Sequence, residues 1–562
     1  MIPYPPGPVH ACRRSKRPRH VARIARTLMI AVVALKPTCV ALGEMPRSSA
    51  DLIEQGRRIY EAGQLGIGEP LRGERGEDGI AAIGRAAACA NCHQRSGFGM
   101  FEATTLVPSV TGPSLFGNDQ PRAGTTRRAK GMQHQEFSFL ERPPYDELSL
   151  ARALREGISP SGHRFQYLMP RYALNDDDMT ALIAYLRQLS LQPSPGLDHD
   201  AVHFATVLAP EQDAARGRAF VEVLQACFGE RHPPAAGARA WQLHVWELSG
   251  SPDTWGAQLG TKYDQQPVFA LISGLAGENW EPVQRFAELQ KIPSLFPNLE
   301  VAPTAEHDAY SFYFSKGAVL EAEVLGQYFA EIGGPSGLTR VVQLLVDGSA
   351  GAKAAARLHD LLTQQSVPIQ ERVLARATTA EIAANLANLT QTDMLVIWLS
   401  REQLGALAGV APPVVGQIMY SGWLSGLEHA PLPPNWKRSA SMVYPVDAPQ
   451  RRDARMQFNL RSWLKQHSIA NVDEILLGNT LAACNILSES MARLRGFYFR
   501  DYLVEMVQNY PTGMGNAPAP QAFPRFALGP GQRYSSKGAY IVRFKDPMTS
   551  ELELMHDWLV PP

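Results

Sequence analysis

Cys89-Ala90-Asn91-Cys92-His93 is the stretch that decides how the first part of this 562-residue chain folds. Two cysteines three positions apart can each bond one vinyl group of a haem, and the histidine after them can then ligate the iron. A zinc site would need further Cys or His pairs nearby, and the other four cysteines are distant. A thioredoxin-type redox pair would need a βαβ setting, whereas this context is helical and rich in glycine. The motif therefore predicts one covalent haem c.

Apolar residues at helical spacing flank the motif on both sides. The two stripes are Leu52, Ile53, Gly56, Ile59 and Tyr60 on the N-terminal side, and Met179, Leu182, Ile183, Leu186 and Leu189 on the C-terminal side. Asn175 can cap the second helix, with Asp178 three residues later. We expect the two helices to cross, with Gly56 allowing a close approach.

Residues 50–192 resemble the class I cytochrome c family. The resemblance rests on Cys89–His93 and on Met169-Pro170-Arg171-Tyr172, which precedes a helix through Ala184-Tyr185-Leu186. It implies an all-α domain in which a Met before the last helix is the second axial ligand of the iron. Carried over, that ligand is Met169, whose soft thioether sulfur suits iron. The resemblance also implies that the Pro108 carbonyl orients His93.

Three other residues remain candidates for the second axial position. Met100 is only seven residues past His93, Met179 falls inside the expected last helix, and His163 lies between the motif and that helix. A methionine inside a helix is more often a core residue than a ligand.

From about Val202 the pattern becomes strand, loop and helix, repeated, which predicts parallel sheets covered by helices. The expected strands are Phe204–Leu208, Leu243–Leu248, Val268–Ile272, Val341–Val346, Met394–Leu399 and Met442–Tyr444; the expected helices include Trp280–Gln290, Ala318–Ile332 and Ala354–Gln364. Because the stretch is too long for one small sheet, we expect two α/β lobes. A linker at 193–200 separates it from the haem domain, and the α/β part spans 201–562.

The order of these segments resembles type I periplasmic ligand-binding proteins, the family of branched-chain amino acid receptors. The marks are Val268–Gly274, Lys291–Phe296, Tyr313–Ser315 and Arg340–Gly348. The resemblance implies a small-molecule site between the lobes, at the carboxyl ends of strands. By position, Ser273, Ser315 and Asp347 would face that cleft. Gly and Ser after strands are also routine turn residues, so loss of ligand binding stays open.

The first 43 residues have the parts of a secretory signal. They contain eight basic residues and no acid, an apolar stretch from Leu28 to Leu35, and small residues at Ala41-Leu42-Gly43. The apolar stretch is too short for a membrane anchor. A lipid anchor on Cys39 is the alternative. We expect export to the periplasm and no membrane span after cleavage.

Charge and cysteine content limit the partners. Lys+Arg and Asp+Glu are both 54, so there is no basic excess and nucleic acid is not expected as a partner. Cys227 and Cys484 are far apart in sequence, and we expect buried thiols, although an oxidising compartment would allow a disulfide. The tryptophans Trp241, Trp246, Trp255 and Trp280 are expected in the core.

Together these features predict an exported single-haem electron carrier rather than a catalyst, because two axial protein ligands leave the iron no open position. Electrons would come from a periplasmic redox partner, for which a quinoprotein dehydrogenase is one candidate. The α/β part would bind a ligand or a partner protein. The alternative is a receptor in which the binding lobes are primary and the haem reports redox state.

Overall fold

The computed structural model describes most of the chain from residue 48 onward. The residues it leaves out after that point are 77–78, 103–104, 118–142, 211–212, 231–238, 278, 306, 333–336, 511–520 and 525. Ser49–Pro562 form one unit. The expected signal segment at 1–43 lies outside the described residues, as does Cys39. Among the helices that are described, none is long and apolar enough to cross a membrane.

The first region, up to about residue 192, combines helices with short strands. Its helices are α1 (Ser49–Ala62), α2 (Ala90–His93), α3 (Gly112–Phe116), α4 (Glu147–Glu156) and α5 (Asp176–Gln188). Its strands are β1 (Arg72–Arg75), β2 (Ile80–Ile83), β3 (Met100–Glu102), β4 (Thr105–Val107) and β5 (Arg171–Tyr172). A 3-10 turn, η1 (Gly84–Ala87), leads into α2.

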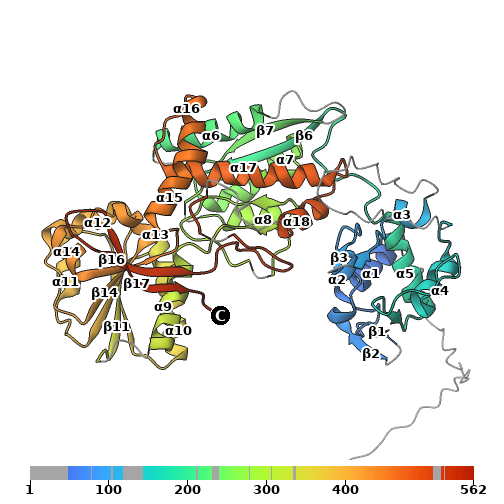
Figure 1. The fold of residues 1–562 in the computed structure, drawn as a ribbon, viewed down its shortest axis with the longest axis horizontal. Coiled ribbons are helices and arrows are strands. Elements are labelled where there is room, and N and C mark those ends of the chain that lie inside the picture. Colours follow the sequence, from blue (N-terminus) through green and yellow to red (C-terminus); the bar gives the residue numbers. More distant parts are fainter. Residues whose placement is uncertain are drawn as a thin grey trace, which may run out of the picture. The chain divides into compact units, whose positions relative to one another are not determined.

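The two flanking helices, α1 and α5, pack against each other as expected (Figure 1). Asn175 caps α5 by accepting a hydrogen bond from the main-chain N–H of Asp178 at 2.7 Å. Gly56 lies at the crossing, where an added Cβ would be 2.0 Å from the carbonyl oxygen of Ala181. Only glycine therefore allows this approach, and Ile59 and Tyr60 on the same face are buried.

The expectation of an all-α haem domain is wrong in one respect. A three-stranded sheet has the order β2-β1-β5, and β3 pairs with β4 as a hairpin. The glycine-rich stretch after α1 forms β1 and β2, and Gly73 on β1 lies opposite Tyr172 on β5. The sheet therefore joins this insertion to the Met169–Tyr172 segment.

A five-stranded parallel sheet opens the α/β region, with the order β10-β9-β8-β6-β7. Its strands are β6 (Ala201–Leu208), β7 (Ala240–Glu247), β8 (Ala270–Ile272), β9 (Ser294–Leu295) and β10 (Ser311–Phe312). The helices α6 (Ala214–Gly229), α7 (Trp255–Gln265) and α8 (Glu281–Leu289) provide the crossovers that parallel strands need. Trp246, Trp255 and Trp280 are buried in the core beside α7 and α8, which confirms their core role.

A seven-stranded sheet follows, with the order β12-β11-β13-β14-β15-β16-β17. Its strands are β11 (Arg340–Val346), β12 (Ile369–Leu374), β13 (Asp393–Trp398), β14 (Gln417–Ser421), β15 (Ala440–Tyr444), β16 (Ala539–Phe544) and β17 (Leu552–Leu559). The strands are parallel up to β15, and β16 and β17 add antiparallel to the edge. The expected alternation of parallel strands and helices is therefore confirmed.

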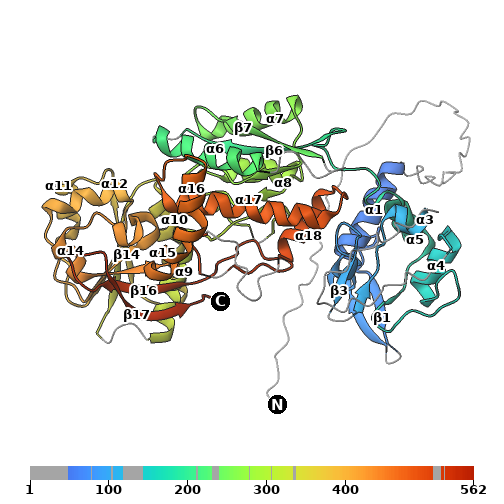
Figure 2. The same ribbon diagram turned by 45° about the horizontal axis from the view of Figure 1, so that its top comes forward.

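Helices cover both faces of the seven-stranded sheet (Figure 2). One face packs against α9 (Ala318–Ile332) and α10 (Ala350–Gln364) through side chains such as Met394 and Val396. The other face, with Leu395 and Ile397, belongs to the core that contains α11 (Thr379–Leu386), α12 (Arg401–Leu404) and α14 (Pro434–Ser439). Successive residues of one strand thus enter different cores, as the two-residue period requires.

The remaining helices lie after β14 and β15, and some of them return to the first sheet. They are α13 (Gly422–Ser425), α15 (Pro449–Met456), α16 (Ser462–Gln466), α17 (Glu474–Leu494) and α18 (Arg500–Gln508). The long α17 runs along α6, the helix that connects β6 to β7 of the first sheet (Figure 1). Cys227 on α6 and Cys484 on α17 form a disulfide. The expectation of buried thiols is therefore wrong, because α17 brings the second cysteine back over 257 positions of sequence.

Candidate functional site

The haem-binding motif occupies a single helical turn. Cys89 stands at the N-cap of α2, and the main-chain N–H of His93 donates to the Cys89 carbonyl at 2.9 Å. Cys92 and His93 are the last two residues of this turn. Both Cys89 and Cys92 are thiols in the structure, whereas the other two described cysteines are joined in a disulfide. One turn therefore presents two thiols and an imidazole.

The ring of His93 is buried and oriented by one hydrogen bond. Its Nδ1 lies 2.9 Å from the carbonyl oxygen of Pro108. Because a carbonyl can only accept, Nδ1 carries the proton and Nε2 keeps its lone pair. Burial also lowers the pKa of His93, which favours the neutral imidazole that a metal requires. The contact expected between Pro108 and His93 is confirmed.

The segment that contains Met169 lies next to this turn. Tyr172, three residues after Met169, hydrogen-bonds to the Cys89 thiol. Burial raises the pKa of that thiol to about 12, so Cys89 is uncharged at neutral pH. Met169 itself is half-buried and packs against the core of the haem domain. The Met169–Tyr172 segment and Cys89 therefore line the same part of the domain.

The other candidate axial ligands lie in different settings. Met179 is buried on α5 among the core residues of the domain. His163 is exposed on the loop after α4. Met100 is on β3, where its sulfur accepts a hydrogen bond from the Gln94 amide at 2.5 Å.

Arg75 on β1 supplies a positive charge near the motif. Its Nε is buried and has no hydrogen-bond partner among the described residues. Its charge lies close enough to Tyr172 to lower the pKa of that hydroxyl, against the larger effect of burial, which raises it. A buried donor without a partner is costly. The residues of this region, two thiols, an imidazole, a thioether and an arginine, suit a haem with its negatively charged propionates.

A second candidate site lies between the two sheets of the α/β region. A cavity of about 20 Å³ is lined by residues from β9 onward, from α13, from α17 and from the segment before β16. The residues used below are Asn298, Ser315, Trp423, Asn479 and Phe523. A cavity of this size holds about one water molecule, whereas small-molecule pockets usually measure about 300 Å³ or more.

The three residues expected at a ligand cleft lie at different distances from this cavity. Ser315 lines it, and its hydroxyl accepts a hydrogen bond from the main-chain N–H of Gly317 at 3.1 Å. Ser273 is fully buried, and its hydroxyl accepts from Asn298 at 3.0 Å. Asp347 is exposed on the turn after β11 and does not line this cavity. The structure thus brings only Ser315 to the cavity.

Four of these lining residues were missed from the sequence. Trp423 lies between β14 and β15, Asn479 and Phe523 lie in the long connection between β15 and β16, and Asn298 sits in a loop without a motif. No local pattern marks them, because they meet only after α17 and the C-terminal segment return to the first sheet. The pairs Phe296-Pro297 and Phe523-Pro524 were the available sequence signal for the cavity, and it is weak.

The α/β region is similar to solved substrate-binding proteins of low sequence identity. A possible leucine/isoleucine/valine-binding protein from Rhodopirellula baltica SH 1 has 13% identity and a TM-score of 0.47, covering 65% of this chain and 98% of that one. A branched-chain amino acid ABC transporter structure from Thermus thermophilus with bound valine has 11% identity and a TM-score of 0.47, covering 65% and 97%. A fatty acid ABC transporter substrate-binding protein from Thermomonospora curvata has 13% identity and a TM-score of 0.45, covering 66% and 95%.

No curated protein matches the chain. The family model for cytochrome c matches residues 80–190, a stretch that contains α2, Pro108, Met169 and α5. Membership of that family implies covalently bound haem c. Residues 80–190 of this chain are a cytochrome c domain.

Proposed function

We propose that this protein is an exported single-haem cytochrome that carries electrons from a periplasmic dehydrogenase to a further acceptor. The observation that carries the proposal is the turn that presents Cys89, Cys92 and His93 together, with the imidazole oriented by Pro108. When bound, haem c supplies an iron that gains or loses one electron. The protein's part is to hold the group covalently, to fill the axial positions and to control its surroundings.

Each residue of the proposed haem site has one role. Cys89 and Cys92 would hold the haem as thioethers, and His93 and Met169 would ligate its iron. The buried Nε of Arg75 offers a hydrogen bond to a propionate. With His93 and Met169 both bound, the iron would have no free position for oxygen or peroxide, and it would supply one-electron transfer.

The disulfide supports the proposed export. Disulfides form and persist in oxidising compartments such as the periplasm and are rare in the cytosol. The Cys227–Cys484 pair joins α6 to α17 of the α/β region at two buried positions. Attachment of haem c and formation of this disulfide would then take place in the same compartment.

We propose partner binding as the main role of the α/β region. Aromatic side chains are among the residues that line the cavity, and its volume of about 20 Å³ leaves no room for an amino acid in this conformation. A quinoprotein dehydrogenase is a suitable partner, because such an enzyme needs a one-electron acceptor outside the cytoplasm.

A ligand receptor is the second candidate function. The polar groups of Asn298, Ser315 and Asn479 line the cavity, and two sheets joined by crossing segments can open about a hinge. Titration calorimetry with valine and leucine tests this candidate. Binding that also shifts the haem potential would support the receptor, and absence of binding would remove it.

The test of the electron-carrier proposal is the visible spectrum of the mature protein, oxidised and reduced, with and without carbon monoxide. We expect a low-spin spectrum that carbon monoxide does not change. Met169→Ala should open one axial position, so that the reduced protein binds carbon monoxide. Met100→Ala and Met179→Ala are the matched controls and should keep the closed spectrum. Carbon monoxide binding by the unaltered protein would overturn the proposal.

A further inference from the structure

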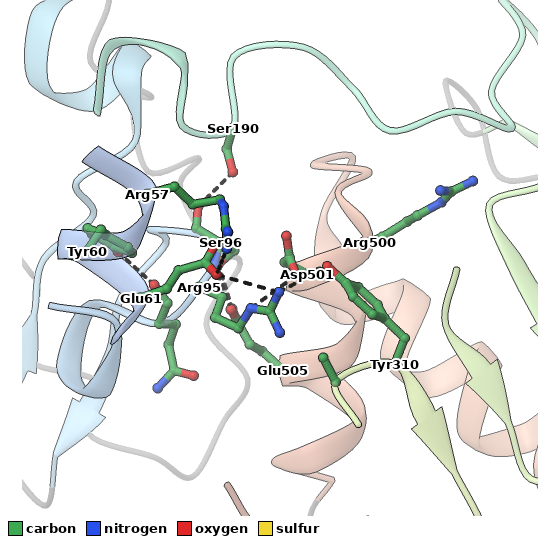
Figure 3. Close-up of polar contacts among 12 residues, drawn as sticks. Arg57, Tyr60, Glu61, Arg95, Ser96, Ser190, Tyr310, Arg500, Asp501 and Glu505 are labelled. Carbon is green, nitrogen blue, oxygen red and sulfur yellow. Dashed lines mark hydrogen bonds and ion pairs between the residues drawn. The ribbon is translucent and has the colours of Figure 1, made fainter. Parts of the chain in front are cut away.

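Hydrogen bonds fix the loop that follows His93, residues 94–110. Within this loop, the buried Ser96 is bonded through its main-chain N–H, its hydroxyl and its carbonyl. The N–H donates to Glu505 Oε1 at 2.8 Å, and the hydroxyl donates to Glu505 Oε2 at 2.5 Å. The Ser190 hydroxyl donates to the Ser96 carbonyl at 2.6 Å. Figure 3 shows Ser96 between Ser190 and Glu505.

Main-chain hydrogen bonds connect the same loop to His93. The main-chain N–H of Gly99 donates to the His93 carbonyl at 3.0 Å, and that of Val110 donates to the Gly97 carbonyl at 2.7 Å. Pro108, whose carbonyl orients His93, lies within the part of the loop that the bond between Val110 and Gly97 closes. At Gly99, which has φ +77°, an added Cβ would be 2.2 Å from the Val107 carbonyl oxygen. The loop is therefore too tightly packed for Ser96 to move without moving Pro108.

Glu505 belongs to a helix that is anchored in the α/β region. Arg500, at the start of α18, is buried and donates to the main-chain carbonyls of Val268 at 2.6 Å and Phe269 at 3.2 Å. Beside Glu505, the ring of Tyr502 stacks on Phe98 of the haem loop with a centroid distance of 4.4 Å. The Glu505 carboxyl is thus fixed by an element that does not belong to the haem domain.

Glu505 is a buried acid, with 3% of its surface exposed. Burial raises its pKa to about 8, although the two hydrogen bonds from Ser96 act in the opposite direction. The negative charge of Asp501 also raises that pKa, and the positive charge of Arg95 lowers it. The other charged or titratable groups that act at this junction are Tyr60 and Glu61 of α1, Tyr185 of α5, Tyr310 before β10, Arg493 at the end of α17, Arg495 just after it and Tyr502 of α18. Arg95 is itself held by Asp501 and by the Tyr310 hydroxyl.

Resting on the electron-carrier function proposed above, we propose that Glu505 is a positioning residue for the haem, acting through Ser96 on the loop that orients His93, and that it takes up a proton when the domain is reduced. The electron comes from the redox partner and the proton from water; on oxidation both are released. Oxidation adds positive charge at the iron, which favours the Glu505 carboxylate. The reduced protein therefore holds the proton more tightly, and the haem potential falls as the pH rises through the pKa of Glu505.

The experiment measures the haem potential of the full-length holoprotein between pH 6 and 10. We expect the potential to fall with rising pH in the unaltered protein. In Glu505→Gln the dependence on pH centred near 8 should disappear, and the potential should stay near the low-pH value, because Gln keeps hydrogen bonds to Ser96 but cannot ionise. Glu489→Gln, which removes an exposed acid from α17, is the matched control and should keep the full dependence.

Two further readouts separate this inference from the proposed function. In Ser96→Ala the inflection should move to higher pH, because one hydrogen bond that stabilises the carboxylate is lost. The infrared difference spectrum between reduced and oxidised protein should contain a protonated-carboxyl band that is absent in Glu505→Gln. An unchanged dependence on pH in Glu505→Gln, with a closed and reversible haem, overturns the inference alone. Carbon monoxide binding by the unaltered protein overturns the proposed function instead.

Discussion

The haem site and the α/β cavity are assembled in opposite ways. Of the four residues proposed to hold the haem, Cys89, Cys92 and His93 lie in one helical turn, and only Met169 comes from another segment. The loop that closes on this turn ends at Pro108, whose carbonyl contacts His93. The cavity is lined by residues from near 297 to 523, which meet only when α17 and the C-terminal segment return to the first sheet. The motif turn is formed by one short segment and meets the α/β region at the contact between Ser96 and Glu505, whereas the assembled cavity depends on every crossing segment.

The largest effect is expected from removing the haem thiols. Cys89→Ser combined with Cys92→Ser should abolish covalent haem, because no other described cysteine is near the motif. Haem staining after denaturing electrophoresis measures this directly. If the haem site and the α/β cavity are assembled separately, the α/β region of this variant should still unfold cooperatively. Loss of that unfolding transition would show that the α/β region needs the haem.

A smaller effect is expected from opening the disulfide of the α/β region. Cys227→Ala combined with Cys484→Ala releases α17 from α6, and the loss of stability should be about 2–4 kcal/mol. Urea unfolding followed by tryptophan fluorescence measures it, since Trp246, Trp255 and Trp280 lie in this region. The haem content should equal that of the unaltered protein. Loss of haem together with the disulfide would show that the two sites are not independent.

The helix crossing at Gly56 tests how local the haem site is. Gly56→Ala should push α1 away from α5 and cost about 1–3 kcal/mol, because the new Cβ would overlap the Ala181 carbonyl. Urea unfolding followed at the Soret band measures this loss. Gly260→Ala on α7 is the matched control, since an added Cβ there meets nothing within 4 Å. Equal stability of the two variants would mean that the motif turn needs no support from the crossing.

The parts of the molecule that were predicted from sequence carry local signals. The motif at Cys89, the cap at Asn175 and the buried strand at Met394 each follow from a few neighbouring residues. The pairing of β1 with β5, the return of α17 and the contact between Ser96 and Glu505 do not. They bring together residues far apart in sequence, and nothing in either local pattern specifies the partner. An acid between Val504 and Met506 was the sole local sign that Glu505 occupies an unusual position.

The central claim is that each chain carries one electron on one closed haem. A coulometric titration of the mature holoprotein, with absorbance followed at the haem bands and haem content determined on the same sample, tests it most directly. The account predicts one haem and one electron per chain in a single reversible transition. A second transition, more than one haem per chain, or consumption of oxygen by the reduced protein would contradict it.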